Sequence, residues 1–190
     1  MRVLLIDCED SYTLNIYDYL MQCDVDVDIV LHQNVIISEI RIYDALVLSP
    51  GPKSPSEIPL LTEVIMQYNR QLPILGICLG HQAIGMYFGH ELIKSKLPMH
   101  GISVKITLAE NPIFHNIDTG NFIAMRYNSL AIAENEGSEL EVIGRDEFGE
   151  IMAFQHRTLP IYSFQFHPES IGTPDGLNLF QNWIKLITKN

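Results

Sequence analysis

The first half of the chain alternates between short apolar runs and segments whose apolar residues recur at helical spacing. Continuous apolar runs are typical of strands buried on both faces of a sheet, and the helical stripes are typical of helices that cover such a sheet. The predicted strands lie at residues 3–6, 25–29, 45–48 and 74–78, and the predicted helices at 14–21, 60–68 and after 78. This order predicts an α/β fold with an open, mostly parallel sheet and helices on both of its faces.

The second half has a different pattern. Residues 103–166 form short, β-rich pieces separated by turn dipeptides, which predicts an antiparallel extension of hairpins and no further crossover units. Thr173-Pro174-Asp175 predicts the start of a final amphipathic helix, with Thr173 as its cap. Because the chain contains no repeat or linker, we expect residues 1–190 to form a single domain.

Composition excludes several classes of function. The 12 basic and 23 acidic residues give a net charge of −11, which argues against nucleic acid as a partner. Three cysteines without a CxxC pair argue against a disulfide framework or a cysteine-rich metal site, so we expect a reducing, cytoplasmic setting and no bound metal. No apolar run approaches the roughly 18 residues that would predict a membrane span.

Cys78 lies where an apolar run meets a predicted helix, inside the sequence GICLG at residues 76–80. This is the G-x-nucleophile-x-G pattern of a nucleophile elbow, in which the glycines allow a sharp turn. A helix that begins at Leu79 directs its free N–H groups and dipole at the sulfur and favours the thiolate. We therefore expect Cys78 to be a nucleophile. An inert, buried cysteine is the alternative, and it is our interpretation of Cys8 and Cys23.

A thiolate nucleophile needs a base and a group that orients the base, and His167-Pro168-Glu169 offers both. Residues i and i+2 of an extended chain project to the same side, and Pro168 restricts His167 to extended backbone. We expect this motif to lie exposed at the end of a strand and to serve Cys78. The alternative is a surface turn without a catalytic role, in which both side chains face water. The remaining histidines are expected to be structural or solvated; they are His32, His81, His90, His115 and His156.

Several motifs together resemble those of class I (triad-type) glutamine amidotransferase domains. GICLGHQ and FHPES resemble the two signature motifs of that family, and SPGP resembles its glycine-rich loop. The segments MHG and RYNSL narrow the match to the small subunits of anthranilate synthase and of 4-amino-4-deoxychorismate (p-aminobenzoate) synthase. These segments occupy residues 76–82, 166–170, 49–52, 99–101 and 126–130.

The resemblance implies a mechanism and a set of site residues. Cys78 attacks the carboxamide of glutamine, His167 moves the protons, and Glu169 holds the imidazole. The N–H groups of Gly51 and Leu79 form the oxyanion hole. The residues implied to bind the substrate are Gly51, Gln82, Ser129 and Leu130.

The resemblance also implies a partner. Ammonia would pass to a larger subunit that aminates chorismate with Mg²⁺, whereas glutamine hydrolysis itself needs no metal or organic cofactor. Met99, His100 and Gly101 are implied to contact that subunit. Four departures from the family pattern leave the triad intact. Lys53 follows SPGP where glycine is usual, Asn128 replaces a histidine, and Ile102 replaces a common lysine. The segment at residues 8–12 differs from the usual Asn-x-Asp-Ser-Phe at Cys8 and at Tyr12.

Three alternatives remain open from the sequence. The chain could be an amidotransferase for another acceptor, such as GMP or carbamoyl phosphate synthesis, although MHG and RYNSL argue against this. It could be a catalytically silent regulatory domain, which only Lys53 and Asn128 favour. A cysteine hydrolase that acts on peptides fits least well, because Gln82 and the His-Pro-Glu context suit amidotransferases better.

Overall fold

A computed structural model describes residues 1–188 and contains a nine-stranded sheet of order β2-β1-β3-β4-β11-β10-β9-β6-β7. Its first five strands are parallel: β2 (Asp26–Leu31), β1 (Arg2–Asp7), β3 (Ala45–Leu48), β4 (Ile74–Ile77) and β11 (Ile161–Phe164). The other four pair antiparallel: β10 (Ile151–His156), β9 (Leu140–Asp146), β6 (Ile102–Leu108) and β7 (Phe122–Arg126). A separate ladder joins β5 (Leu92–Lys94) to β8 (Leu130–Ile132).

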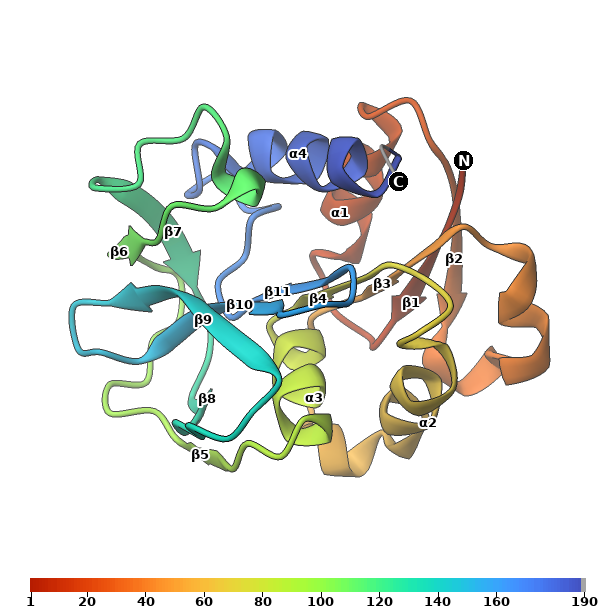
Figure 1. Ribbon diagram of the computed structural model, residues 1–190, viewed down its shortest axis with the longest axis horizontal. Helices are drawn as coiled ribbons and strands as arrows, with labels where there is room; N and C mark the ends of the chain where they lie inside the picture. Colours follow the sequence, from red (N-terminus) through yellow and green to blue (C-terminus); the bar gives the residue numbers. More distant parts are fainter. Residues whose placement is uncertain (189–190) are drawn as a thin grey trace.

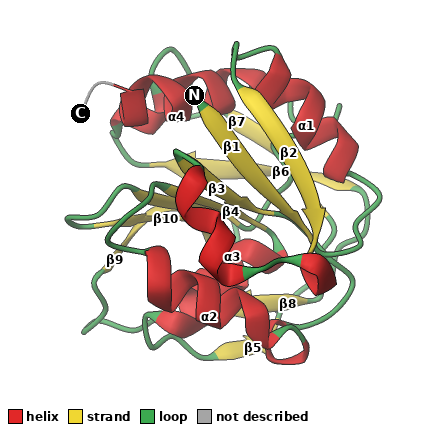
Figure 2. Cartoon of the chain, turned by 90° about the vertical axis from the view of Figure 1, so that its right-hand side faces the viewer, coloured by secondary structure: helices red, strands yellow, loops and turns green. Residues whose placement is uncertain are grey.

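Helices cover both faces of this sheet (Figure 1, Figure 2). On one face α1 (Thr13–Met21) and α4 (Gly176–Thr188) contact each other, and on the other α2 (Pro59–Tyr68) contacts α3 (Leu79–Tyr87). Each face buries its own apolar cluster, which is why the central strands β3 and β4 are buried along their whole length. Residues 1–188 also contain four short 3₁₀ turns: η1 (His32–Asn34), η2 (Ile37–Ile42), η3 (Pro55–Glu57) and η4 (Pro112–Phe114).

The predicted α/β class, the order of elements in the first half and the antiparallel extension are confirmed. Two details are wrong. β11 does not belong to the extension, because it returns to the parallel region and pairs with β4. Thr173 does not cap the last helix, which begins at Gly176. The Thr173 hydroxyl instead donates to the carbonyl of His167 (2.7 Å) and accepts the N–H of Met125 (3.0 Å). Thr173 therefore holds the loop that carries His167 against β7.

The topology places the predicted site residues together. Parallel strands end at one edge of a sheet, and ligands of open α/β sheets bind at that edge. Cys78 follows β4, Gly51 follows β3, and His167 follows β11 three residues after its end. Among residues 1–188 no helix has the length and apolarity needed to cross a membrane.

Candidate active site

Cys78 occupies a strained turn between β4 and α3. Its φ of 51° and ψ of −100° lie outside the regions that L residues favour, and its N–H donates to the carbonyl of Phe164 (2.8 Å) on β11. The helix begins at the next residue, Leu79, so Cys78 lies at the end of α3 where the first-turn N–H groups are free of helical partners. The predicted elbow is therefore present in the geometry of the backbone.

Close packing around the elbow explains its two glycines. A Cβ on Gly76 would lie 2.6 Å from the carbonyl oxygen of Gly80, and a Cβ on Gly80 would overlap the carbonyl of Leu48 on β3. Neither neighbour is a flexible side chain, so the backbone itself would have to move. The spacing GxCxG is thus required for α3 to lie against the sheet with Cys78 at its start.

We expect Gly80→Ala to destabilise the protein by about 1–3 kcal/mol, because the new methyl group overpacks main chain. It should also reduce any activity of Cys78, since the overlap pushes the start of α3 away from β3. Urea unfolding measures the first effect. Gly137→Ala is the matched control, because its Cβ would meet nothing closer than 3.7 Å. Equal stability of the two variants would contradict the packing argument.

His167 and Glu169 form a buried pair, with Nδ1 of the imidazole 2.6 Å from Oε1 of the carboxylate. Each residue is only 2% exposed, so the expectation that this motif lies exposed is wrong. Extra backbone bonds enclose it: the His167 N–H donates to the carbonyl of Met125 (2.9 Å), an isolated bridge to β7. β7 and the Ser170–Thr173 turn cover His167 and Glu169, which would be exposed to water at an uncovered strand end.

The charges around His167 favour its protonated form. Burial lowers the pKa of His167, but the charges of Glu169 and Cys78 outweigh burial and hold this pKa well above its ordinary value. The Nε2 atom has no hydrogen-bond partner of good geometry among the described residues. The Nε2 atom is therefore available to exchange a proton with the Cys78 thiol. In catalytic pairs this contact often tightens only when substrate binds.

A pocket of about 330 Å³ opens at this elbow. It brings together predicted residues from four segments of the chain. Its lining residues are Gly51, Pro52, Lys53, Ser54, Glu57, Cys78, Gln82, His100, Tyr127, Asn128, Ser129 and Leu130. Gly51 approaches Leu79 closely enough that a Cβ on Gly51 would lie 2.6 Å from the Leu79 side chain. The two predicted oxyanion donors therefore belong to neighbouring residues.

Gln82 is held by two hydrogen bonds at the base of this pocket. Its amide donates to the carbonyl of Leu130 (3.2 Å) and to the side chain of Gln165 (3.1 Å). With its Nε2 engaged, Gln82 presents its amide oxygen as the remaining group for a ligand.

The three residues predicted to contact a partner differ in their exposure. Met99 is 4% exposed and packs in the apolar core, so its side chain offers little surface to a partner. His100 is exposed and lines the pocket, and Gly101 is exposed with a φ of 72°.

Two tyrosines belong to the site although the sequence did not point to them. The Tyr127 ring lies edge-on to His167 with a centroid distance of 4.8 Å, and Tyr12 lies at 5.8 Å from the same imidazole. A hydrogen bond to Tyr127, together with desolvation, raises the pKa of Tyr12 to about 12. The Tyr12 phenol therefore stays neutral beside the imidazole, and the Tyr127 ring packs against the same imidazole. The position of Tyr127 inside RYNSL was the available signal, and for Tyr12 it was only the resemblance of residues 8–12 to a segment of the family.

Lys53, the departure in the glycine-rich loop, does not distort that loop. The non-glycine residues with positive φ in the described chain are Glu9, Asp24, Cys78 and Asn116, and Lys53 is absent from this set. Its ammonium pairs with Glu9 (2.9 Å), whose carboxylate also contacts His32 (3.4 Å). The hydrogen bond from Lys53 lowers the pKa of Glu9. His32 is therefore part of a polar cluster at the mouth of the pocket and not an isolated surface residue.

The other cysteines and histidines fit the structural interpretation. Burial raises the pKa of Cys8 to about 12 and that of Cys23 to about 11, so both remain inert thiols. His81 is fully buried, stacks on Phe154 and contacts the Ser163 hydroxyl (2.9 Å). Burial lowers the pKa of His81 to about 3, which excludes it as a base at neutral pH.

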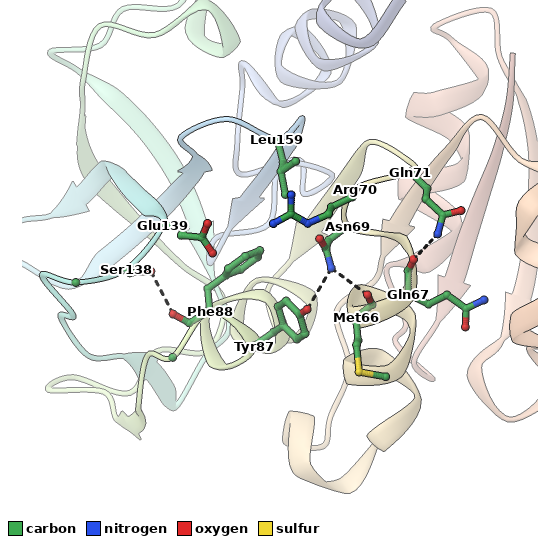
Figure 3. Close-up of a pocket in the computed structure, with 12 residues that line it drawn as sticks. Met66, Gln67, Asn69, Arg70, Gln71, Tyr87, Phe88, Ser138, Glu139 and Leu159 are labelled. Carbon is green, nitrogen blue, oxygen red and sulfur yellow. Dashed lines mark hydrogen bonds between the residues drawn. The ribbon is translucent and has the colours of Figure 1, made fainter.

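A larger cavity, of about 690 Å³, lies at the opposite end of α3 (Figure 3). Some of its polar groups bond to one another: the Asn69 amide donates to the Met66 carbonyl (3.1 Å) and to the Tyr87 hydroxyl (3.1 Å). None of the predicted site residues lines it. Volume alone therefore does not identify the reactive site.

Comparisons with known proteins agree with this arrangement. Residues 4–186 match the family model described as glutamine amidotransferase class-I. A Bacillus subtilis protein named aminodeoxychorismate/anthranilate synthase component 2 is 36% identical over 190 residues, which cover 98% of this chain and 97% of that protein. The bifunctional protein TrpGD of Thermotoga maritima is 35% identical over 97% of this chain, which spans only 32% of its length.

A solved structure extends the agreement to three dimensions. A Thermoplasma acidophilum protein, provisionally described as one subunit of a GMP synthase, superposes with a TM-score of 0.89 at 28% identity. The superposition covers 100% of this chain and 94% of the other.

Proposed function

The chain belongs to the class-I glutamine amidotransferase family, and we propose that it hydrolyses glutamine and delivers ammonia to a chorismate-aminating synthase subunit. One observation carries the glutaminase assignment. The strained Cys78 elbow opens on a pocket of about 330 Å³, beside a buried imidazole that Glu169 holds in place. Cys78 lines this cavity, whereas His167 and Glu169 do not line it and lie buried behind its wall residue Tyr127, whose ring contacts the imidazole.

In the proposed reaction the Cys78 sulfur attacks the carboxamide carbon of glutamine. The N–H groups of Leu79 and Gly51 stabilise the resulting oxyanion. Collapse breaks the carbon–nitrogen bond, His167 gives its proton to the departing ammonia, and a glutamyl thioester remains. Water then attacks the thioester while His167 takes up its proton, which releases glutamate and restores Cys78.

The amino-acid end of glutamine would lie against Ser129 and Leu130, with the Gln82 amide oxygen as an acceptor. The chemistry draws on side chains and main-chain N–H groups alone, so we propose that this half of the reaction uses no metal or organic cofactor. Mg²⁺ would act in the partner subunit. A reducing, cytoplasmic setting suits a mechanism that requires Cys78 as a free thiol, and all three cysteines are free.

The names of the relatives support the choice of acceptor. The Bacillus protein at 36% identity is named a component 2, which implies a separate component that uses its ammonia. The Thermoplasma protein at 28% identity carries a description that implies GMP synthesis instead. The higher identity favours chorismate amination, and we propose a heteromer with a large chorismate-binding subunit.

An assay with candidate partners tests this proposal. We expect weak glutamate release by the chain alone and an increase of about tenfold or more when chorismate and a chorismate-binding synthase subunit are added, a coupling energy typical of linked sites. Chromatography of the products would separate anthranilate from 4-amino-4-deoxychorismate. The synthetase component of GMP synthesis serves as the alternative partner. Stimulation by that component and not by the chorismate-binding one would overturn the acceptor assignment, and no glutamate release with either partner would overturn the glutaminase assignment.

A further inference from the structure

Arg126 lies at the centre of a buried ionic cluster next to the pocket. It is 0% exposed, and its guanidinium pairs with Asp146 and with Glu150 (2.7 Å), which are 6% and 6% exposed. Asp146 ends β9 and Glu150 precedes β10, so both carboxylates come from one hairpin. Neither Arg126 nor the two acids line the pocket.

The cluster holds two carboxylates for one guanidinium, and further donors offset the surplus negative charge. Glu150 accepts the Ser95 hydroxyl (2.9 Å) and the Lys96 N–H (2.5 Å). Asp146 accepts the N–H groups of Phe148 (3.0 Å) and Glu150 (2.8 Å). A buried polar network in which every group has a partner is rigid. Apolar residues of similar volume could stabilise the fold equally well. Stability alone therefore does not account for the ionic groups.

The same guanidinium reaches the pocket wall through Asn128. Its Nε donates to the Asn128 side-chain oxygen (3.0 Å), and the Asn128 amide donates to the carbonyl of Leu130 (2.8 Å). That carbonyl also accepts Gln82. Asn128 is 4% exposed and fills the gap between Arg126 and the main chain of Leu130.

Backbone bonds complete this arrangement from the other side. The N–H of Ser95 donates to the Ser129 carbonyl (3.0 Å), and the N–H of Met99 donates to the Asn128 carbonyl (3.1 Å). With the carbonyls of Asn128, Ser129 and Leu130 all engaged, the orientation of each peptide plane in the wall is set. The N–H groups that face a ligand are set with them.

We propose that Arg126 and Asn128 are positioning residues for glutamine binding, which act through the main chain of Ser129 and Leu130. The hairpin carboxylates hold Arg126, Arg126 orients Asn128, and Asn128 fixes the Leu130 peptide. This inference rests on the proposed glutaminase function, because it assumes that the main chain of Ser129 and Leu130 binds the amino-acid end of glutamine. It also explains how asparagine replaces the usual histidine: the amide links both neighbours without an ionisable ring.

Calorimetric titration of glutamine into Cys78→Ser protein measures binding without chemistry. We expect Asn128→Ala to weaken the affinity by about tenfold or more, because it removes one of the two donors to the Leu130 carbonyl and leaves the Arg126 Nε unpaired. Asn128→Asp keeps an acceptor for Arg126, but it replaces the donor to Leu130 with an acceptor and adds a negative charge to the buried cluster. It should weaken binding by at least a similar factor, and urea unfolding of the same variant checks that it is folded. In the Cys78-containing protein the same changes should raise KM for glutamine and leave kcat within about threefold.

Two Glu→Gln substitutions distinguish a positioning role of the buried cluster from the general effect of losing a carboxylate that pairs with arginine. Glu150→Gln weakens the hold on Arg126 and should raise KM, whereas Glu134→Gln breaks the exposed Glu134–Arg145 pair (2.5 Å) and should not. Unchanged affinity in Asn128→Asp, or a loss of kcat at constant KM, would overturn the inference while the glutaminase assignment stands. Protein that neither binds nor hydrolyses glutamine would overturn both. Binding that depends on Asn128 without hydrolysis would support the inference and contradict the reaction.

Discussion

Cys78→Ser is expected to reduce glutamate release from glutamine by about 1,000-fold or more. A serine hydroxyl has the same shape, so the elbow and the buried His167–Glu169 pair should persist. The hydroxyl is a far weaker acid than a thiol, however, and the charges that favour a thiolate–imidazolium pair do not suffice to ionise it. The loss should therefore appear in kcat, while glutamine still binds.

The control uses the other half of the proposed reaction. Ammonium salts should still support product formation by Cys78→Ser in complex with the synthase subunit, because that route bypasses the thiol. Cys8→Ser is the matched variant, since burial raises the pKa of Cys8 to about 12 and the mechanism does not use it. Wild-type rates of glutamate release in Cys78→Ser, or an equal loss in Cys8→Ser, would show that the nucleophile is misassigned.

The parts of the site that depend on local spacing could be predicted from the sequence. A glycine two residues on either side of Cys78 determines the elbow, and one proline between His167 and Glu169 keeps their side chains on the same side. Each pattern acts within a few residues of chain. The two patterns come together because β11 returns to the parallel region and pairs with β4, whereas the sequence pattern had placed that strand in the antiparallel extension.

The parts that depend on contacts between distant segments could not be predicted. Tyr12 reaches the imidazole only because α1 begins beside the Tyr127 segment, and no local spacing predicts that contact. His167 is buried by a bridge to Met125, which is 42 residues earlier in the chain, so its exposure was misjudged. Lys53 could be recognised as unusual, but its partner Glu9 is 44 residues away.

Glu169→Gln is expected to lower kcat for glutamine hydrolysis by about 100-fold or more. The amide can still accept the hydrogen bond from Nδ1 and keep the imidazole in place, so the fold and KM should change little. It cannot stabilise the positive charge that His167 carries when the thiol is ionised. Glu134→Gln, an exposed change of the same kind on the protein surface, should leave kcat unchanged.

The pH dependence distinguishes an electrostatic role for Glu169 from a purely geometric one. Burial lowers the pKa of His167, and the charge of Glu169 is the largest of the effects that raise it well above its ordinary value. Removing that charge leaves burial less opposed, so the pKa of His167 should fall. Because the departing ammonia takes its proton from the imidazolium, the alkaline limb of the kcat profile should move to lower pH in Glu169→Gln. A limb at the same pH with a lower plateau would mean that Glu169 only orients the ring, and that another charge keeps His167 protonated.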